Sequence, residues 1–294
     1  MAEGGGTDLS AGADASSQAT LADIASVSHQ QSAAENFPVA LRIIPSRQRG
    51  HLMRLYAFAR FVDDVGDEAE GNRLELLDLI DQDVHKLRTG RPELPPVAGL
   101  APVMADCDLT IEPLLNLIEA NRIDQRVQRY ASFDELLGYC RLSAAPIGRM
   151  VLQLAGVAGE DLIAKSDSIC AGLQVLEHCQ DVAEDARAGR VYLPSVDLQS
   201  AGVADADLLA ASTSPQLRTV VALQVDRARG LLQLGRPLIG RLRGWSRFAV
   251  TGYLAGGLAT ADALQSAGYN VLAGQIRPSK VRTMTHATRL MVGR

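Results

Sequence analysis

Several features that would place this chain in a common functional class are missing from it. The cysteines are few, at Cys107, Cys140, Cys170 and Cys179, and they show neither CxxC spacing nor a pairing pattern. Buried thiols in a reducing cytosol are therefore expected. No Gly-rich dinucleotide fingerprint follows a strand, so we expect no nicotinamide cofactor. Charged residues make up 21% of the chain and the net charge is −5, so nucleic acid is not expected as the main partner.

Long apolar runs and alternating runs are also absent. No segment reaches the ~18 uninterrupted apolar residues typical of a membrane-spanning helix, and the nearest, residues 248–264, contains Thr251 and Thr260. No alternating segment is long enough to indicate a sheet. Residues 1–30 are rich in Gly, Ala, Ser and Asp and lack the basic start and apolar core of a signal peptide. We therefore expect a disordered tail there and a cytoplasmic location for the protein.

Helical periodicity, in contrast, runs through the rest of the chain. Hydrophobic residues make up 47% of the sequence, enough for a sizeable core in one all-helical domain over residues 31–294. Residues 89–109, which are rich in proline, are expected as a surface loop. The pattern predicts helices at residues 31–44, 47–64, 72–89, 110–122, 133–157, 160–187, 205–211, 215–240, 244–266 and 279–292. The predicted fold class is therefore all-α.

Two acidic clusters stand out within these helices, DDVGDE at residues 63–68 and EHCQDVAED at residues 177–185. Both repeat carboxylates four residues apart, which places them on one helix face. The pairs are Asp63 with Asp67, Asp64 with Glu68, Glu177 with Asp181 and Asp181 with Asp185. Like charges at this spacing repel each other by a few tenths of a kcal/mol per pair. A chain that repeats the pattern is expected to bind a cation there.

Acidic runs more commonly mark solvated helix faces, or acids near a helix start that favour the helix dipole. Here both clusters continue strongly apolar segments, residues 55–62 and 169–176, so the carboxylates are expected to face a cavity. Mg²⁺ is the cation that one or two carboxylates commonly hold together with water and phosphate. Two such faces opposing each other would hold several Mg²⁺ ions around a diphosphate. Cys179 lies inside the second cluster, where we favour a packed small side chain over a catalytic nucleophile.

Several motifs together resemble one known family. They are the segments at residues 56–68, 139–144, 146–149, 172–174, 180–185 and 189–194. In combination they are similar to the squalene/phytoene synthase family, the head-to-head branch of the all-α isoprenoid synthases. The resemblance extends over about residues 34–285. It implies a single-domain helical bundle with a central cavity, acting on prenyl diphosphates.

The resemblance also implies where the chemistry lies. The expected catalytic and metal-binding carboxylates are Asp63, Asp67, Asp181 and Asp185, with Asp64 as a further metal candidate and Glu68 and Glu184 in support. Diphosphate leaves readily only when its charge is neutralised, which Mg²⁺ would do. Arg60 and Arg190 are expected to bind phosphate oxygens, and Tyr192 and Gln174 to contact substrate. For Arg60, a salt bridge with Asp64 is the alternative.

The cation left after diphosphate departs needs a dry, apolar cavity. Aromatic residues are only 4% of the chain, so few rings can stabilise it. The candidates are Phe37, Tyr56, Phe58 and Tyr253, for which core packing is the alternative. Small residues either line a tunnel for a long isoprenoid or let helices pack closely, and these are Ala144, Ala145, Gly148, Gly256 and Gly257.

One subgroup fits the segment at residues 35–40, ENFPVA, best. Its bacterial members, in the hopanoid pathway, convert presqualene diphosphate and water to hydroxysqualene and diphosphate. The competing interpretation is condensation of two prenyl diphosphates to presqualene diphosphate or phytoene. A C30 product dissolves only in lipid, so peripheral contact with the inner membrane face is expected, as is contact with sister enzymes of the squalene pathway.

Three positions depart from the family pattern. Glu177 stands where members usually carry Asn, Gln180 where phytoene synthases have Arg, and Ala145 where a polar residue is common. Glu177 either binds metal itself or impairs the site. These changes leave open a non-catalytic relative that serves as an assembly or scaffold partner. The presence of all four expected aspartates argues against that alternative.

Overall fold

The computed structural model describes residues 17, 20–21, 24–25 and 44–293, which form helices and one isolated bridge between Arg129 and Val191. The all-α prediction is confirmed. Most of the tail predicted at residues 1–30, and residues 31–43 of the helix predicted at 31–44, including Phe37, lie outside the described residues. The few described positions before residue 30 are helical, and Leu21 and Ala25 among them are buried, while the disordered tail as a whole stays a prediction. The four-residue spacing of Leu21 and Ala25 places both on one helix face.

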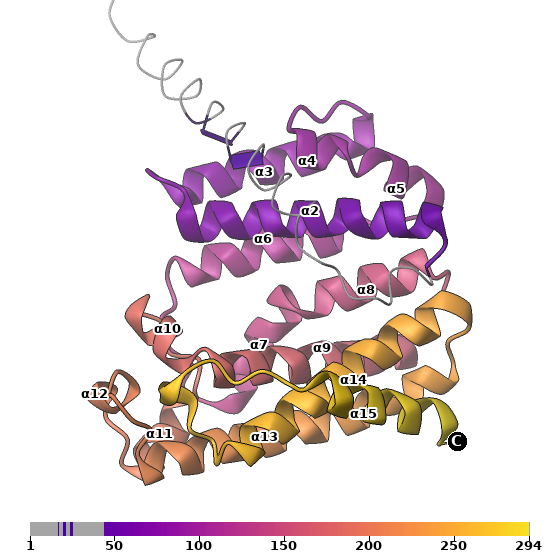
Figure 1. Ribbon diagram of the computed structural model, residues 1–294. Coiled ribbons are helices and arrows are strands. Elements are labelled where there is room, and N and C mark those ends of the chain that lie inside the picture. The colour runs from indigo at the N-terminus through magenta and orange to yellow at the C-terminus, as the bar shows by residue number, and fades with distance from the viewer. Residues whose placement is uncertain (1–16, 18–19, 22–23, 26–43, 294) are drawn as a thin grey trace, which may run out of the picture. The chain divides into compact units, whose positions relative to one another are not determined.

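The chain divides into two compact units, one built on Ser46–Gln125 and the other on Arg126–Arg294. The expectation of one domain over residues 31–294 stays a prediction. The first unit contains α2 (Ser46–Glu68), α3 (Arg73–Lys86), η2 (Leu87–Thr89), α4 (Pro95–Ala98), α5 (Ala101–Cys107) and α6 (Glu112–Asp124). In it α2, α3 and α6 pack against one another (Figure 1). Their shared core includes the fully buried Phe58, Phe61, Leu77, Ile80 and Ile118.

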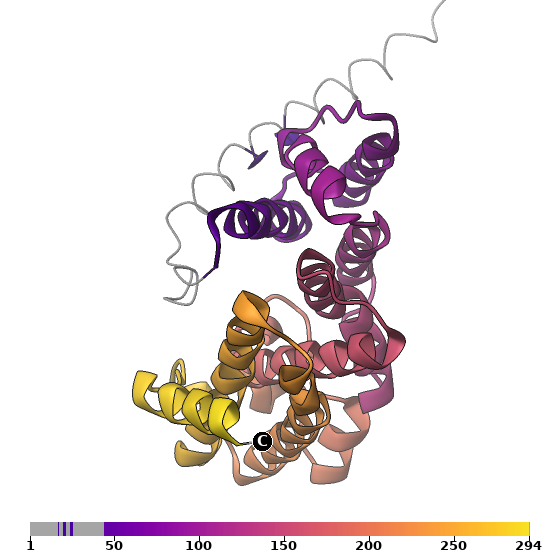
Figure 2. The same cartoon turned by 90° about the vertical axis from the view of Figure 1, so that its right-hand side faces the viewer.

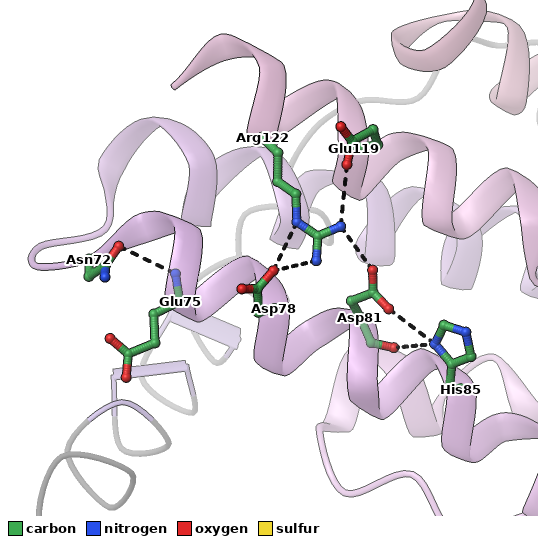
Figure 3. Close-up of polar contacts among 7 residues, drawn as sticks. All are labelled: Asn72, Glu75, Asp78, Asp81, His85, Glu119 and Arg122. Carbon is green, nitrogen blue, oxygen red and sulfur yellow. Dashed lines mark hydrogen bonds and ion pairs between the residues drawn. The ribbon is translucent and has the colours of Figure 1, made fainter. Parts of the chain in front are cut away.

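A polar network fixes α3 against α6 on the outer side of this core (Figure 3). Arg122 of α6 donates to Asp78 through Nε at 3.0 Å and to Asp81 through Nη1 at 2.9 Å. The side chain of Asn72 caps α3 by accepting from the backbone N–H of Glu75. Because Arg122 bonds two carboxylates one turn apart, it holds the register of the two helices. The first acidic cluster therefore lies on a helix, α2, that is packed against two others.

The second unit contains α7 (Phe133–Ser143), α8 (Ala145–Leu154), α9 (Glu160–Gln180), α10 (Val182–Arg187), α11 (Ser195–Ala201), α12 (Asp205–Leu208), α13 (Pro215–Gly235), η3 (Arg236–Gly240), α14 (Gly244–Ser266), η4 (Val271–Ala273) and α15 (Lys280–Val292). Its most extensive packing joins α9 to α13. Glycines allow this approach: a Cβ on Gly235 would lie 2.6 Å from the carbonyl oxygen of Lys165. On the other side of the unit α15 packs along α14 (Figure 2).

The predicted elements were wrong in several places, and the helix α11 was not predicted. The helix predicted at 133–157 is two helices, because Pro146 has no N–H to donate to the carbonyl of Leu142. The helix predicted at 160–187 is interrupted at Asp181, whose backbone has φ −103° and ψ 16°. The loop predicted at 89–109 contains α4 and α5, each with a proline in its first turn, where the missing N–H costs nothing.

Of the four cysteines, Cys140 and Cys179 are buried as expected, whereas Cys107 and Cys170 are half-buried. All four cysteines are free, and burial raises the pKa of Cys140, Cys170 and Cys179 to about 12. Cys179 is therefore a protonated, packed side chain rather than an activated thiolate. Within the described part of the chain, no helix combines the length and apolar character needed to cross a bilayer.

Candidate functional site

The first acidic cluster, Asp63, Asp64, Asp67 and Glu68, occupies the last turns of α2. Asp63, Asp67 and Glu68 are exposed, whereas Asp64 is buried. Asp63 Oδ1 accepts a hydrogen bond of 3.0 Å from Asn121 Nδ2 on α6. The same amide group donates to the carbonyl of Leu117 at 3.2 Å, so the Asn121 side chain is held by its own helix. Asp63 is thus oriented by a neighbouring helix, not only by its own.

The charge balance around Asp63 is unfavourable for a bare carboxylate. Although Asp63 is exposed, the surrounding protein atoms remove part of the hydration of its carboxylate, and this raises its pKa to about 6. The negative charges of Asp67 and Asp64 act in the same direction, while the hydrogen bond from Asn121 and the charge of Arg60 oppose it. A carboxylate that resists ionisation in this way would be relieved by a cation beside it.

Asp64 forms an ion pair within its own helix. Arg60 Nε donates to Asp64 Oδ1 at 2.7 Å, one turn earlier on α2. The alternative interpretation of Arg60, a salt bridge with Asp64, is therefore present in the structure, although Asp64 is buried rather than at the surface. Tyr56 lies one turn before Arg60 and is half-buried. Metal binding by Asp64 and substrate contact by Arg60 and Tyr56 stay predictions.

Gly66 brings α2 and α6 close together beside Asp63. A Cβ at Gly66 would lie 2.0 Å from Asn121 Oδ1, so no larger residue fits while Asn121 keeps its place. Gln125 Nε2 donates to the carbonyl of Gly66 at 2.9 Å and to that of Asn121 at 3.2 Å. Sequence reasoning missed Asn121 and Gln125, since 58 residues separate Asn121 from Asp63.

The second acidic cluster, Glu177, Asp181, Glu184 and Asp185, lies where α9 ends and α10 begins. The chain is anchored at the interruption because the side chain of Gln180 donates to the carbonyl of Ile276. Backbone bonds still follow helical spacing across it, with the N–H of Asp181 donating to Glu177 at 3.0 Å and that of Asp185 to Asp181 at 2.8 Å. The carboxylates therefore stay near one another despite the break.

Loss of hydration, followed by repulsion between neighbouring carboxylates, disfavours the charged form of Asp181 in the second cluster. Loss of hydration raises the pKa of Asp181 to about 6, and the charges of Glu177, Asp185 and Glu184 add to the effect, while His178 opposes it. The pKa of Glu177 is raised for the same first reason, with His178 lowering it and Asp185 raising it. Glu177 therefore shares the electrostatic field of the aspartates.

His178 is a residue that the sequence analysis overlooked, although it stands between two members of the motif. Its buried ring stacks on Tyr192, with centroids 3.8 Å apart and planes inclined by 12°. Its Nδ1 lies 3.8 Å from Asp185 Oδ2, and Gln174 Nε2 lies 3.4 Å from its Nε2. His178 thus connects Gln174, Tyr192 and Asp185, three residues predicted separately for substrate or metal.

Tyr192 belongs to a buried aromatic group that also contains Tyr130 and Tyr139. The ring centroid of Tyr192 is 5.9 Å from that of Tyr130 and 5.6 Å from that of Tyr139. The preceding residue, Val191, donates its N–H to the carbonyl of Gln128 at 2.8 Å, which fixes this segment beside Tyr130. Arg190, next to the second cluster, is half-buried and donates its N–H to the carbonyl of Asp185 at 2.8 Å.

The small residues proposed for a tunnel divide into two kinds. A Cβ on Gly148 would lie 2.5 Å from Ser166 Oγ, and one on Gly257 would lie 2.7 Å from a methyl carbon of Leu173, so both glycines permit close helix packing. Gly256 has nothing within 4 Å of its Cβ position. Close packing is therefore the role of Gly148 and Gly257.

The donor set of each cluster fits Mg²⁺. Each presents carboxylate oxygens one turn apart, and each includes an aspartate whose pKa is raised to about 6. Among the described residues, no three His, Cys, Asp or Glu side chains converge closely enough to form a metal cage. Mg²⁺ is usually held by one or two carboxylates, with water and phosphate completing its shell, so carboxylate pairs suit it.

Comparison with known proteins decides the family. The family model of squalene/phytoene synthases matches residues 30–283. The chain belongs to the squalene/phytoene synthase family. This confirms the resemblance drawn from the motifs, and the matched range includes both acidic clusters and the aromatic group.

Three members of the family illustrate the likeness. The chain is 38% identical over 214 residues to the hydroxysqualene synthase of Rhodopseudomonas palustris, covering 71% of this chain and 72% of that protein. It is 34% identical over 222 residues to the hydroxysqualene synthase of Sinorhizobium fredii, covering 74% and 75%. The crystal structure of squalene synthase HpnC from Alicyclobacillus acidocaldarius matches with a TM-score of 0.78 at 36% identity, covering 85% of this chain and 96% of that one.

Proposed function

We propose that this protein converts presqualene diphosphate and water to hydroxysqualene and diphosphate. Its similarity to two hydroxysqualene synthases, at 34–38% identity over about 70% of their length, supports this choice within the family. The structural observation that supports diphosphate chemistry is the pair of acidic clusters with carboxylates one turn apart, each of which includes an aspartate whose pKa is raised to about 6. Such carboxylates are suited to a divalent cation and its diphosphate partner.

The proposed reaction breaks one carbon–oxygen bond and forms another. The bond from carbon to the diphosphate breaks, and its electron pair leaves with the diphosphate. The resulting carbocation rearranges, and water adds through its oxygen and loses a proton. Bound Mg²⁺ would supply charge neutralisation at the departing diphosphate.

The residues of the two clusters take defined roles in this proposal. Asp63 and Asp67 in the first cluster, and Asp181 and Asp185 in the second, would bind Mg²⁺, and Glu177 adds negative charge next to Asp181. Asn121 keeps Asp63 in position, while Asp64 is held by its ion pair with Arg60. Arg190 and the Gln174–His178–Tyr192 group lie beside Asp185 and contact the substrate's polar end. Phe37 and Tyr56 contact its hydrocarbon.

Other family reactions and a scaffold role are the competing proposals. Condensation of two prenyl diphosphates uses the same departure of diphosphate, so the clusters alone do not select against it. A scaffold relative has no reason to keep unfavourable carboxylate pairs, since they destabilise the metal-free fold. The hydrophobic product also implies contact with membrane lipid and with sister enzymes of the squalene pathway.

Product identification tests the proposal. Purified protein with Mg²⁺ is incubated with presqualene diphosphate and, separately, with farnesyl diphosphate, and the products are identified by mass. Hydroxysqualene from the first substrate and no product from the second is the expected result. Presqualene diphosphate formed from farnesyl diphosphate would favour the sister reaction, and squalene formed only with NADPH would overturn the assignment.

A further inference from the structure

The outward face of α15 carries the three most exposed large apolar side chains among the described residues. Val281 is 76% exposed, Met284 68% and Val292 76%. The opposite face packs on α14 and includes the buried Leu290, and His286 Nε2 lies 2.8 Å from Asp262 Oδ2 there. The helix is therefore held along α14 (Figure 2). Its exposed apolar side chains lie on the face away from that contact.

Threonines between these residues extend the apolar stripe. Val281, Thr285, Thr288 and Val292 follow one another at intervals of four, three and four residues, so they lie along one helix face. The hydroxyl of Thr285 donates to the carbonyl of Val281 at 2.9 Å, and that of Thr288 donates to Met284 at 2.9 Å. Because these hydroxyl groups bond back to the helix, the threonines contribute their methyl groups to the outer surface.

Cations border this stripe on both sides. At 100° per residue, Lys280 lies on one flank and Arg282 and Arg289 lie on the other, and all three are exposed. Further arginines meet the C-terminal end: Arg247 Nη2 donates to the carbonyl of Met291 at 3.4 Å, and Arg236 Nη2 is 3.3 Å from the Cβ position of Gly293. No acidic residue occurs in the sequence after Asp262, although the whole chain has a net charge of −5.

We propose that α15 lies in the plane of an anionic lipid surface and attaches the protein to it. An apolar centre with cationic flanks matches the boundary between acyl chains and negatively charged headgroups. A second copy of the chain would bring the same cations face to face, which disfavours a symmetric dimer through this surface. This proposal does not depend on which reaction the protein catalyses.

The test is sedimentation of the purified full-length protein with lipid vesicles. Binding is expected to vesicles that contain phosphatidylglycerol, to be much weaker with phosphatidylcholine alone, and to fall as salt is raised. The triple variant V281S/M284S/V292S should bind at least tenfold more weakly. In K280Q/R289Q, each lost cation should weaken binding by about fivefold.

A matched control distinguishes binding through this surface from nonspecific adsorption of exposed apolar side chains to lipid. V196S/L209S/L223S removes three apolar side chains that are 48%, 53% and 40% exposed on or beside other elements, and it should bind like the parent. All variants should keep the parent's melting temperature, because the changed side chains are exposed. Vesicle binding that is absent, or unchanged in V281S/M284S/V292S, would overturn the proposal. So would a dimer in analytical ultracentrifugation that this variant abolishes.

Discussion

Asp63 and Asp181 are the two side chains on which the proposed chemistry most depends, because each has a strongly raised pKa beside another carboxylate. Asp63→Asn and Asp181→Asn keep the shape of the side chain and remove its charge. Electrostatic contacts to a reacting group are commonly worth about 3 kcal/mol, so each variant should lose about a hundredfold or more in turnover.

The matched control is Asp226→Asn, which removes a carboxylate from the exposed side of α13. Its turnover should equal that of the parent. Steady-state rates with saturating Mg²⁺ and presqualene diphosphate give the comparison. Near-normal turnover in both Asp63→Asn and Asp181→Asn would refute the metal assignment.

A variant at Glu177 tests whether the negative charge of this residue contributes to Mg²⁺ binding in the second cluster. Glu177→Asn keeps an oxygen ligand but removes a negative charge that adds to the raised pKa of Asp181. The variant should stay active, with an apparent Mg²⁺ affinity that is weaker or unchanged, and it should melt slightly higher without metal. Titration of activity against Mg²⁺ measures this. A clear gain in both affinity and turnover would show instead that Glu177 impairs the site.

At the scale of elements, the contact between α2 and α6 positions the first cluster. Gly66→Ala would place a Cβ 2.0 Å from Asn121 Oδ1, so Asn121 must move and the hydrogen bond to Asp63 should be lost. Overpacking of this kind costs about 1–3 kcal/mol in the free energy of unfolding. Gly138→Ala is the control, because it lies in α7 with nothing within 4 Å and should be neutral or stabilising by up to about 1 kcal/mol. Equal unfolding free energies for the two variants in urea would contradict this account.

The sequence predicted which segments are helical better than it predicted where helices are interrupted. Periodicity located α2, α6, α13 and α14 because each has an apolar face that repeats over several turns. It joined α9 to α10 because the apolar pattern continues through Asp181, where the backbone departs from helical geometry. That break coincides with the tertiary bond from Gln180 to Ile276, 96 residues away, which periodicity does not register.

For the candidate site, the motifs identified the carboxylates but not the residues that orient them. Asp63 and Asp181 are visible in the sequence as members of spaced acidic pairs. Asn121 is not, because nothing near it in the chain marks it as a partner of Asp63. His178 was within a quoted motif, but its stacking on Tyr192 arises only when the chain returns after α10.

At the scale of the whole molecule, the raised pKa values predict an unusual dependence of stability on pH. Both aspartates have a folded-state pKa of about 6, above the value of about 3.9 expected in the unfolded chain. Between these values the folded state binds more protons, so stability without metal falls as the pH rises from about 4 to about 6. Asp262 acts oppositely, because His286 and Arg229 outweigh the effect of burial and hold its pKa below its usual range. Ionised Asp262 therefore stabilises the folded state, and this stabilisation is lost as the pH falls.

Comparison with the double variant D63N/D181N isolates the effect of the two aspartates. In EDTA, the parent should melt below the variant at about pH 7, and the difference should shrink as the pH falls toward about 5. Added Mg²⁺ should raise the parent's melting temperature more than the variant's, since it binds the ionised carboxylates. A difference in melting temperature that does not vary with pH would contradict the pKa assignment.

Hydroxysqualene formation from presqualene diphosphate is best followed in ¹⁸O-labelled water, with Mg²⁺ and with EDTA. We expect hydroxysqualene that carries one labelled oxygen when Mg²⁺ is present and almost none in EDTA, because uncompensated diphosphate is a poor leaving group. Equal product in EDTA, or a hydroxyl group without the label, would contradict the proposed reaction.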